Sequence, residues 1–278
     1  MEKHLYSKFY DTDLIYNHSL IDNDNLNEVN PHSHDTYEIL FFKDGDMIYT
    51  EESKSFEVKR NDLILIRPGK IHSHRFTSKK LYDRYDIIFD RCIFPTDILD
   101  RMPENINVIS CDNHKQIVDL FKKMDFYYDY FHGNDYKSIL VSLIQEVFFC
   151  IIAFDIANDS IKNNTYNENP VIAKAVKYIE KNISTDFSLQ DLCNELHITK
   201  SYLYQLFTDN LHTSPKKFIV YKRLTMAQKT VRLGSNPTDI YANCGFSDYT
   251  TFYRSYKKHF GYPPSEERNH SLSVSSLS

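Results

Sequence analysis

The segment Thr238–Arg268 constrains the fold more than any other part of the chain. It reads T-D-I-Y-A-N-C-G-F-S-D-Y-T-T-F-Y-R-S-Y-K-K-H-F-G-Y-P-P-S-E-E-R, which predicts a short apolar helix, a turn at Gly245 and a second helix rich in Tyr, Thr, Arg and Lys. That order is typical of a helix-turn-helix unit whose second helix contacts DNA. A similar unit, Ser188–Phe207, lies upstream. Two such units in tandem indicate a DNA-binding protein far more specifically than one unit does.

The charge is distributed unevenly along the chain. The whole sequence has 278 residues, enough for two domains, and a formal net charge of −5. Residues 170–268 carry 14 Lys and Arg against 9 Asp and Glu, a net charge of +5, whereas residues 1–169 carry 19 against 29, a net charge of −10. We therefore expect the basic half to face a polyanion and the acidic half to face something else.

The cysteines and the N-terminus indicate a cytoplasmic protein. The five Cys form no C-x-x-C pair and their number is odd, which favours free thiols in a reducing compartment. The polar N-terminus does not resemble a signal peptide. The most apolar run, Ile139–Ala157, is interrupted by Gln145, Glu146 and Asp155, so we expect a soluble amphipathic helix rather than a membrane span.

The N-terminal half reads as strands followed by helices. Met1–Asn30 shows no clear period and is expected to be irregular, whereas Tyr37–Phe89 alternates short apolar runs with turns, which predicts an antiparallel sandwich or barrel. Helices are expected at His114–Phe131 and Asn134–Asn158.

The second of these helices carries an apolar stripe with a 4-3-4-3 spacing: Leu140, Ile144, Val147, Ile151 and Phe154. It is open to two interpretations, packing against the domain's own sheet or a dimer seam. The polar, Asn-rich segment 158–170 is predicted to be a linker. The expected domains are thus 1–157 and 171–270.

Removing the inward-facing residues from the two recognition helices leaves the side chains expected to meet DNA. They are Lys200, Ser201, Tyr202, Tyr204 and Gln205 in the first unit, and Asp248, Tyr249, Thr250, Tyr253, Arg254 and Lys257 in the second. Gln and Arg can read base edges. Lys216, Lys217, Lys257 and Lys258 suit phosphates, which supply affinity without sequence information. The alternative for each single residue is an ordinary solvated helix face.

These motifs resemble the AraC/XylS-type DNA-binding domain. The resemblance covers about Pro170–Arg268 and rests on S-L-Q-D-L, Y-L-Y-Q-L-F, the run P-x-x-F-I-x-x-x-R-L-x-x-A (Pro215–Ala227) and G-F-S-D-Y-T-T-F-Y-R-S-Y-K-K-H-F-G-Y-P-P-S-x-x-R. It implies two helices placed in successive major grooves, with half-sites about 10 base pairs apart. His197 stands where the family often has Gly, and His tolerates a positive φ.

A second resemblance lies near the N-terminus. The order H-x-H-x₃-E-x₆-G from His32, with Pro68 and His72 later, is similar to the cupin barrel motif. In cupin enzymes the equivalents of His32, His34, Glu38 and His72 hold a metal. In AraC-type regulators such side chains line a ligand pocket or remain packed polar groups, so three interpretations stay open. The predicted effector-binding set is His32, His34, Glu38, Arg67, His72 and His74, with Tyr37 and Phe42 as further walls.

The sequence predicts an α+β protein: a cupin-like antiparallel barrel with following helices, then an all-α domain with two helix-turn-helix units. We expect a transcription regulator without a metal or other cofactor, controlled by a polar metabolite such as a sugar. Its expected partners are double-stranded DNA, a second copy of the chain and, if it activates, RNA polymerase. One rival hypothesis is a metal-dependent cupin enzyme or metal sensor with an appended DNA-binding domain. Another is an effector-free regulator whose barrel only dimerises.

Overall fold

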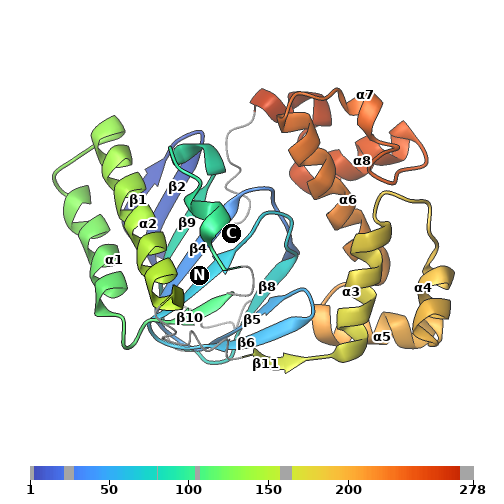
Figure 1. Ribbon diagram of the computed structural model, residues 1–278, viewed down its shortest axis with the longest axis horizontal. Coiled ribbons are helices and arrows are strands. Elements are labelled where there is room, and N and C mark those ends of the chain that lie inside the picture. The colour runs from blue at the N-terminus through green and yellow to red at the C-terminus, as the bar shows by residue number, and fades with distance from the viewer. Residues whose placement is uncertain (1–2, 22–27, 80, 104–106, 157–164, 270–278) are drawn as a thin grey trace.

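The computed structural model describes residues 3–21, 28–79, 81–103, 107–156 and 165–269, which form a β-rich N-terminal domain and a helical C-terminal domain (Figure 1). The strands are β1 (Lys3–Tyr10), β2 (Leu14–Ile21), β3 (Glu28–His32), β4 (Tyr37–Asp44), β5 (Met47–Glu51), β6 (Lys54–Val58), β7 (Asp62–Ile66), β8 (His72–Phe76), β9 (Tyr82–Phe89), β10 (Val108–Ser110) and β11 (Thr165–Glu168). The α-helices are α1 (Lys115–Tyr128), α2 (Gly133–Ile156), α3 (Pro170–Asn182), α4 (Leu189–Leu196), α5 (Lys200–Leu211), α6 (Pro215–Arg232), α7 (Pro237–Ile240) and α8 (Tyr249–Phe260). Short 3-10 helices are η1 (Arg91–Ile93), η2 (Ile98–Arg101) and η3 (Pro264–Asn269).

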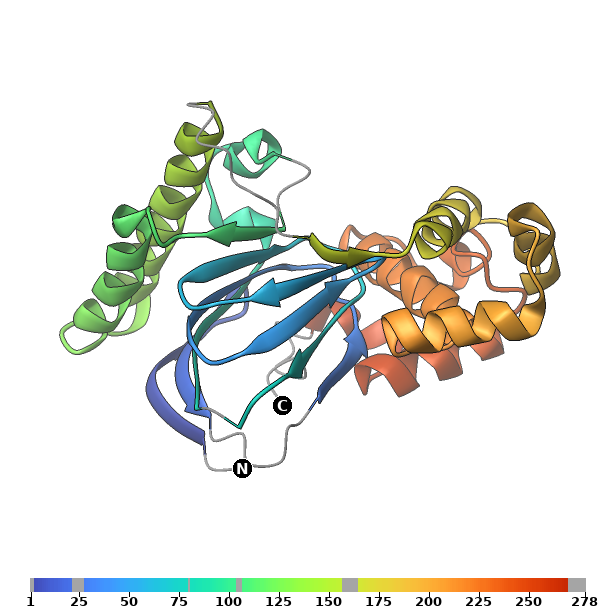
Figure 2. The same cartoon turned by 90° about the horizontal axis from the view of Figure 1, so that it is seen from below.

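The N-terminal domain is built from two antiparallel sheets that face each other (Figure 2). One sheet has six strands in the order β1-β2-β9-β4-β7-β10, and the other has five in the order β11-β6-β5-β8-β3. Side chains alternate across β4: Leu40 and Phe42 point into the space between the sheets, whereas Ile39 and Phe41 point to the outer face. The predicted antiparallel domain followed by helices, and the all-helical C-terminal half, are confirmed.

Helices α1 and α2 cover the outer face of the six-stranded sheet (Figure 1). The apolar stripe of α2, from Leu140 to Ile151, is buried in the same cluster as the sheet, and Phe154 packs partly against it. The stripe therefore packs within its own domain, and the interpretation of these residues as a dimer seam is wrong. Among the described residues, α2 is the one helix whose length and composition would allow a membrane crossing; that is weak evidence, because core helices pass the same test.

A buried polar cluster fastens α1 to the sheet. The Asp125 carboxylate on α1 accepts hydrogen bonds from Ser7 (2.6 Å), Tyr16 (2.9 Å) and Tyr85 (2.7 Å). The His18 ring stacks on Tyr85 and lies 2.8 Å from Asp125 on one side and 2.9 Å from Asp83 on the other. Burial lowers the pKa of His18, but its hydrogen bonds to the two carboxylates outweigh burial and raise the pKa above the ordinary value.

This arrangement predicts a pH-dependent stability. Because the pKa of His18 is higher in the folded than in the unfolded state, the folded protein binds the proton more tightly, and the stabilisation is complete below the unfolded pKa of about 6.5. It is lost as pH rises through the folded pKa. We expect His18→Gln to flatten this part of the pH profile in denaturation experiments, whereas the same change at exposed His132 leaves it as it is; a profile unchanged by His18→Gln would contradict the assignment.

The N-terminal 30 residues correct the sequence analysis. They were expected to be irregular, but β1 and β2 form a hairpin and β2 pairs with β9 over eight residues; residues 1–2 and 22–27 lie outside the described residues. The sequence of β2 lacks the usual alternation of polar and apolar residues, because both faces of the strand are covered. The polar residues Asn17, His18 and Ser19 are therefore buried. Residues 165–168 of the predicted linker form β11, which pairs with β6; residues 158–164 lie outside the described residues, and the domain boundaries stay a prediction.

The C-terminal domain consists of two helix-turn-helix units built on one connecting helix. The first unit, α4–α5, begins with a capping box between Ser188 and Asp191 and turns at His197, whose φ of 54° is left-handed as expected. The second unit is α7–α8. The helix α6 contributes Phe218 and Ile219 to the core of the first unit, and Leu224, Ala227 and Val231 to that of the second. The two units are therefore attached to opposite ends of a single helix, α6.

Candidate DNA interface and effector pocket

The recognition helices present most of the predicted DNA-contacting side chains to solvent. Thr199 caps α5 through the amide of Tyr202, so the N-terminal turn of α5 is well defined. Most polar or charged residues of the set are exposed on the two helices, among them Lys200, Ser201, Gln205, Thr250 and Arg254. Tyr202 is 46% exposed and Lys257 is also exposed, whereas Tyr204 and Tyr253 are half-buried.

Two predicted residues have structural tasks in α8. The carboxylate of Asp248 caps the helix, accepting hydrogen bonds from the amide (2.8 Å) and the hydroxyl (2.7 Å) of Thr251. Tyr249 is half-buried, with its ring near those of Tyr241 and Phe252. Both residues hold the start of the helix in place, and whether they also touch DNA stays a prediction.

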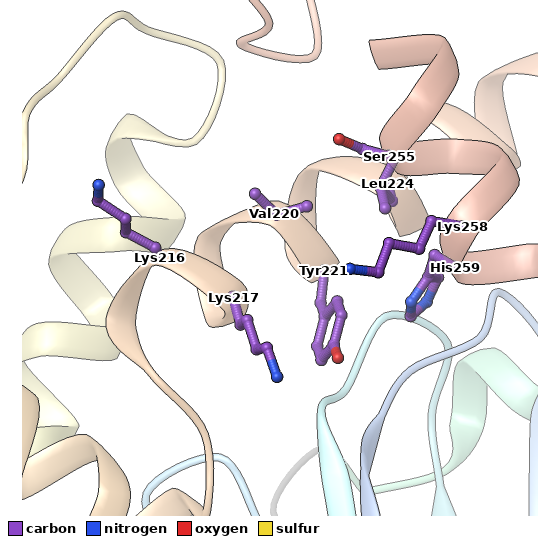
Figure 3. A pocket seen from close by; sticks show the side chains of 8 residues that line it. All are labelled: Lys216, Lys217, Val220, Tyr221, Leu224, Ser255, Lys258 and His259. Atoms are coloured by element: carbon purple, nitrogen blue, oxygen red, sulfur yellow. The ribbon is translucent and has the colours of Figure 1, made fainter. Parts of the chain in front are cut away.

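Three of the four lysines expected to bind phosphate line one groove between α6 and α8, and Lys257 lies outside it. This groove has a volume of about 420 Å³ and is lined by Lys216, Lys217, Val220, Tyr221, Leu224, Ser255, Lys258 and His259 (Figure 3). Its floor is apolar, whereas three ammonium groups stand at its rim. Lys216 and Lys217 come from the first turn of α6, next to α5, and Lys258 comes from α8. The positive charges of the groove thus come from the connecting helix and from the second recognition helix.

The four residues of the histidine motif come together at the end of the barrel that faces α6. One ring nitrogen from each of His32, His34 and His72 lies within 4.8 Å of the others. Glu38 accepts a hydrogen bond from His34 Nε2 at 2.9 Å and lies 3.6 Å from His72 Nε2. The Nδ1 atoms of all three histidines lie close to backbone carbonyls, those of Asn30, Thr36 and Lys70. The rings are therefore held with Nε2 facing the shared space, where Glu38 already engages that of His34.

The protonation states in this pocket differ from residue to residue. Burial would raise the pKa of Glu38, but hydrogen bonds from His34 and His72 hold it well below the usual range. For His72, burial is outweighed by Glu38, and the pKa is raised. Burial, with His72 and His34 nearby, lowers the pKa of His32 to about 3. The pocket thus combines a carboxylate that favours the protonated form of His72 with a neutral imidazole at His32, which can donate and accept one hydrogen bond each.

Deeper in the barrel, His74 lies with buried polar residues that were not predicted from the sequence. His74, from the predicted set, is 6% exposed and neither ring nitrogen has a hydrogen-bond partner among the described residues. Burial and the neighbouring Arg84 lower its pKa well below the ordinary value. Arg84 is paired with Asp86 at 3.3 Å, but within the described part of the chain neither its Nε nor the amide nitrogen of Asn17 has a hydrogen-bond partner. Buried polar groups of this kind are costly unless something hydrogen-bonds them.

Arg67 does not belong to this pocket. Its guanidinium donates to the carbonyl of Pro103 at 2.6 Å and lies near Tyr37, on the outer side of the six-stranded sheet. The sequence order placed it near the histidines, but it follows the inward-facing Ile66, so its side chain points the other way. The prediction that Arg67 and Tyr37 face the histidines is therefore wrong.

The three imidazoles would also suit a transition metal. His32, His34 and His72 could each offer Nε2, and backbone carbonyls already hold their Nδ1 atoms, as is usual behind metal-bound histidines. Glu38, however, already takes the Nε2 atom of His34, so a metal would have to displace that hydrogen bond.

Comparison with known proteins assigns both domains. Residues 18–89 match the family model of the AraC-like ligand binding domain, and residues 192–270 match that of a helix-turn-helix domain. The chain belongs to the AraC family. The first match spans the barrel strands around the histidine pocket, and the second spans both recognition helices of this AraC-family protein.

Several relatives are regulators of sugar operons. The chain is 32% identical over 134 residues to the raffinose operon transcriptional regulatory protein RafR of Pediococcus pentosaceus, covering 47% of each chain. It is 30% identical over 164 residues to the lactose operon transcription activator of Staphylococcus xylosus, covering 56% of this chain and 55% of that one. This AraC-family chain thus spans about half the length of the curated relatives it matches. Among solved structures, ToxT from Vibrio cholerae matches with a TM-score of 0.41 and 14% identity, covering 95% of this chain and 100% of that one.

Proposed function

We propose that the protein is a sequence-specific DNA-binding transcription regulator controlled by a small polar metabolite bound in its barrel. The observation that carries the proposal is the pair of exposed recognition helices fixed to one connecting helix. At 1.5 Å per residue, the 18 residues of α6 extend over about 27 Å, and the units packed at its two ends add to this span, which compares with about 34 Å for one turn of duplex DNA. This spacing supports two major-groove contacts on one face of a bipartite site.

Binding assays with a duplex selected from a random pool test the DNA contacts. We expect Gln205→Ala and Arg254→Ala each to cost about 1–3 kcal/mol on the selected duplex and to relax preference at one position. Alanine at Lys216, Lys217 or Lys258 is expected to weaken all duplexes alike and to reduce the salt dependence by about one counterion. Asp239→Ala, an exposed change outside both recognition helices, is the control; if no duplex is preferred over the pool, the proposal fails.

The effector is proposed to be a polyhydroxylated compound such as a sugar. Neutral His32 and His74, the free Nε of Arg84 and the amide of Asn17 are donors and acceptors suited to several hydroxyl groups in an enclosed space. The two relatives named for raffinose and lactose operons support this class. The predicted set His32, His34, Glu38, His72 and His74 is therefore retained as the effector site, with Arg84 and Asn17 added.

Thermal unfolding in a panel of mono- and oligosaccharides tests the pocket. A sugar present at 100 times its Kd stabilises the folded protein by about 2.7 kcal/mol, so we expect at least one sugar to raise Tm. The shift should be lost in His74→Phe and kept in the exposed variant His132→Phe. Metal analysis of the same preparation decides the alternative: one tightly held divalent metal per chain would favour a metal sensor over a sugar sensor.

The remaining partners follow from the proposal. We propose a homodimer in the cytoplasm and, if the protein activates transcription, contact with RNA polymerase. Since the α2 stripe is buried, a dimer would have to use another surface, and light scattering of the full chain measures whether it forms.

A further inference from the structure

We propose that the segment His32–Thr36 couples occupation of the histidine pocket to α6 and α8, so that the barrel and the DNA-contacting helices respond to one another. The inference rests on the proposed function and adds its means of regulation. Alternate residues of this segment face opposite sides. His32 and His34 surround the pocket with His72, whereas Ser33 and Asp35 contact the C-terminal domain.

The contacts of Ser33 and Asp35 reach three places in the C-terminal domain. The hydroxyl of Ser33 lies 2.6 Å from that of Thr225 on α6, and its backbone hydrogen-bonds the ring of His259 on α8. Asp35 accepts a hydrogen bond from Arg232, at the end of α6, at 2.5 Å. A short segment that lines the pocket thus touches both the connecting helix and the second recognition helix.

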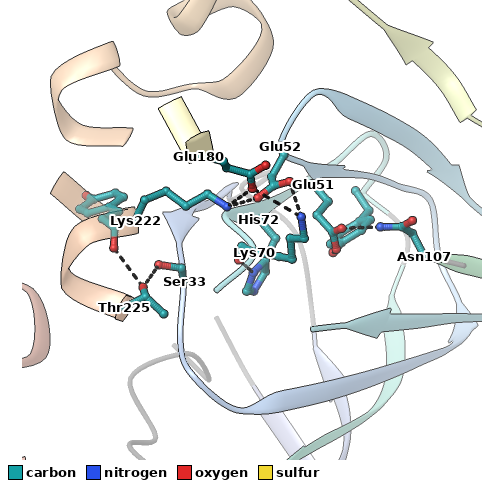
Figure 4. A network of polar contacts seen from close by, with 11 residues as sticks. Ser33, Glu51, Glu52, Lys70, His72, Asn107, Glu180, Lys222 and Thr225 are labelled. Atoms are coloured by element: carbon teal, nitrogen blue, oxygen red, sulfur yellow. Dashed lines mark hydrogen bonds and ion pairs between the residues drawn. The ribbon is translucent and has the colours of Figure 1, made fainter. Parts of the chain in front are cut away.

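A group of four charges reinforces this junction. Glu52 and Lys70 of the barrel form ion pairs with each other, and with Lys222 of α6 and Glu180 of α3 (Figure 4). Lys222 binds both Glu52 and Glu180, the latter at 3.0 Å, and Lys70 lies 2.7 Å from Glu52. Lys70 also precedes Ile71, which is buried among C-terminal core residues. We call this network, together with the Ser33 and Asp35 contacts, the interdomain latch.

The interdomain latch and the histidine pocket are also joined by hydrogen bonds to the backbone. The amide of Gly69 donates to the carbonyl of His34 at 2.8 Å, and a side chain at Gly69 would touch the methyl group of Thr225. The carbonyl of Lys70 accepts from His72. A ligand that hydrogen-bonds the Nε2 atoms of His34 and His72 competes with Glu38 for them, and both rings belong to the two segments that hold α6. Occupation of the pocket therefore competes with the latched arrangement.

Hydrogen–deuterium exchange of the full chain tests the coupling. Ser33→Ala and Asp35→Asn should each accelerate exchange in residues 222–232 of α6 by about threefold to tenfold, as expected for loss of one contact. His34→Ala removes only pocket-side contacts, with Thr36 and Glu38, yet should accelerate the same peptides. The matched controls are Asp97→Asn and His132→Ala, at exposed positions.

The coupling would be overturned if α6 exchanged faster in Ser33→Ala and Asp35→Asn but at the wild-type rate in His34→Ala. It would also be overturned if none of the variants changed the exchange of α6. Exchange of β6 separates coupling from unfolding, because it stays protected if the barrel is intact; His34→Gln replaces His34→Ala if it does not. None of these measurements needs DNA or a ligand. A failure to select any duplex would therefore defeat the proposed function and leave the exchange result standing.

Discussion

Gly245→Ala is expected to destabilise the C-terminal domain by about 2–5 kcal/mol. Gly245 has a φ of +81°, which costs an alanine about 1–2 kcal/mol. A Cβ there would also lie 2.5 Å from the carbonyl oxygen of Ile183 and 2.5 Å from Arg223 Nε, and such overpacking adds about 1–3 kcal/mol. Guanidinium denaturation followed by far-UV circular dichroism measures the loss.

The same substitution at Gly261 is the control for backbone strain alone. Gly261 has a φ of +86°, and a Cβ there would meet nothing within 4 Å. We therefore expect about 1–2 kcal/mol for Gly261→Ala. Equal losses at the two positions would contradict the idea that the turn of the second unit presses on the loop after α3. Gly245→Ala should also weaken binding to a bipartite duplex more than to a single half-site, because this contact sets the spacing of the units.

Glu267→Ala is expected to cost about 3–5 kcal/mol, because it leaves buried partners without their anion. Glu267 is 1% exposed and accepts hydrogen bonds from the Tyr256 hydroxyl, from Arg232 Nε at 2.6 Å and from Gln228 at 3.2 Å. It joins α8, α6 and η3, so its removal should loosen the second helix-turn-helix unit as a whole. Thermal unfolding and DNA binding should both report the change.

The neighbouring residue supplies the control for Glu267. Glu266 has the same charge, lies in the same 3-10 helix and is exposed, so Glu266→Ala should change stability by no more than about 0.5 kcal/mol. Glu267→Gln should fall between the two, since it keeps the shape and removes the charge. Equal effects of Glu266→Ala and Glu267→Ala would show that the buried network contributes little.

The helix-turn-helix units were predictable because their signals are local. Ser188 and Thr199 cap their helices, His197 takes the left-handed turn, and Gly245 marks the second turn, each within a few residues of the helix it delimits. The histidine motif was predictable for the same reason, since His32, His34 and Glu38 lie in one short stretch.

The rest depended on partners far away in the sequence. Strand β2 forms because its backbone pairs with β9, almost 70 residues later. No local pattern marks Arg84 and Asp86 as buried; they lie inside the barrel because β9 pairs between β2 and β4. The same holds for Ser33 and Asp35, whose partners Thr225 and Arg232 lie in another domain.

The shared helix α6 sets the rotation of the two units relative to each other about its axis, as well as the distance between them. Each residue added to a helix turns everything beyond it by about 100° and moves it by about 1.5 Å. A single insertion in the middle of α6 would therefore aim the second recognition helix away from the duplex face that the first one reads. An insertion of four residues would nearly restore the direction but lengthen the step. The number of residues in α6 thus helps to determine the spacing and relative orientation of the two half-sites that the protein can bind.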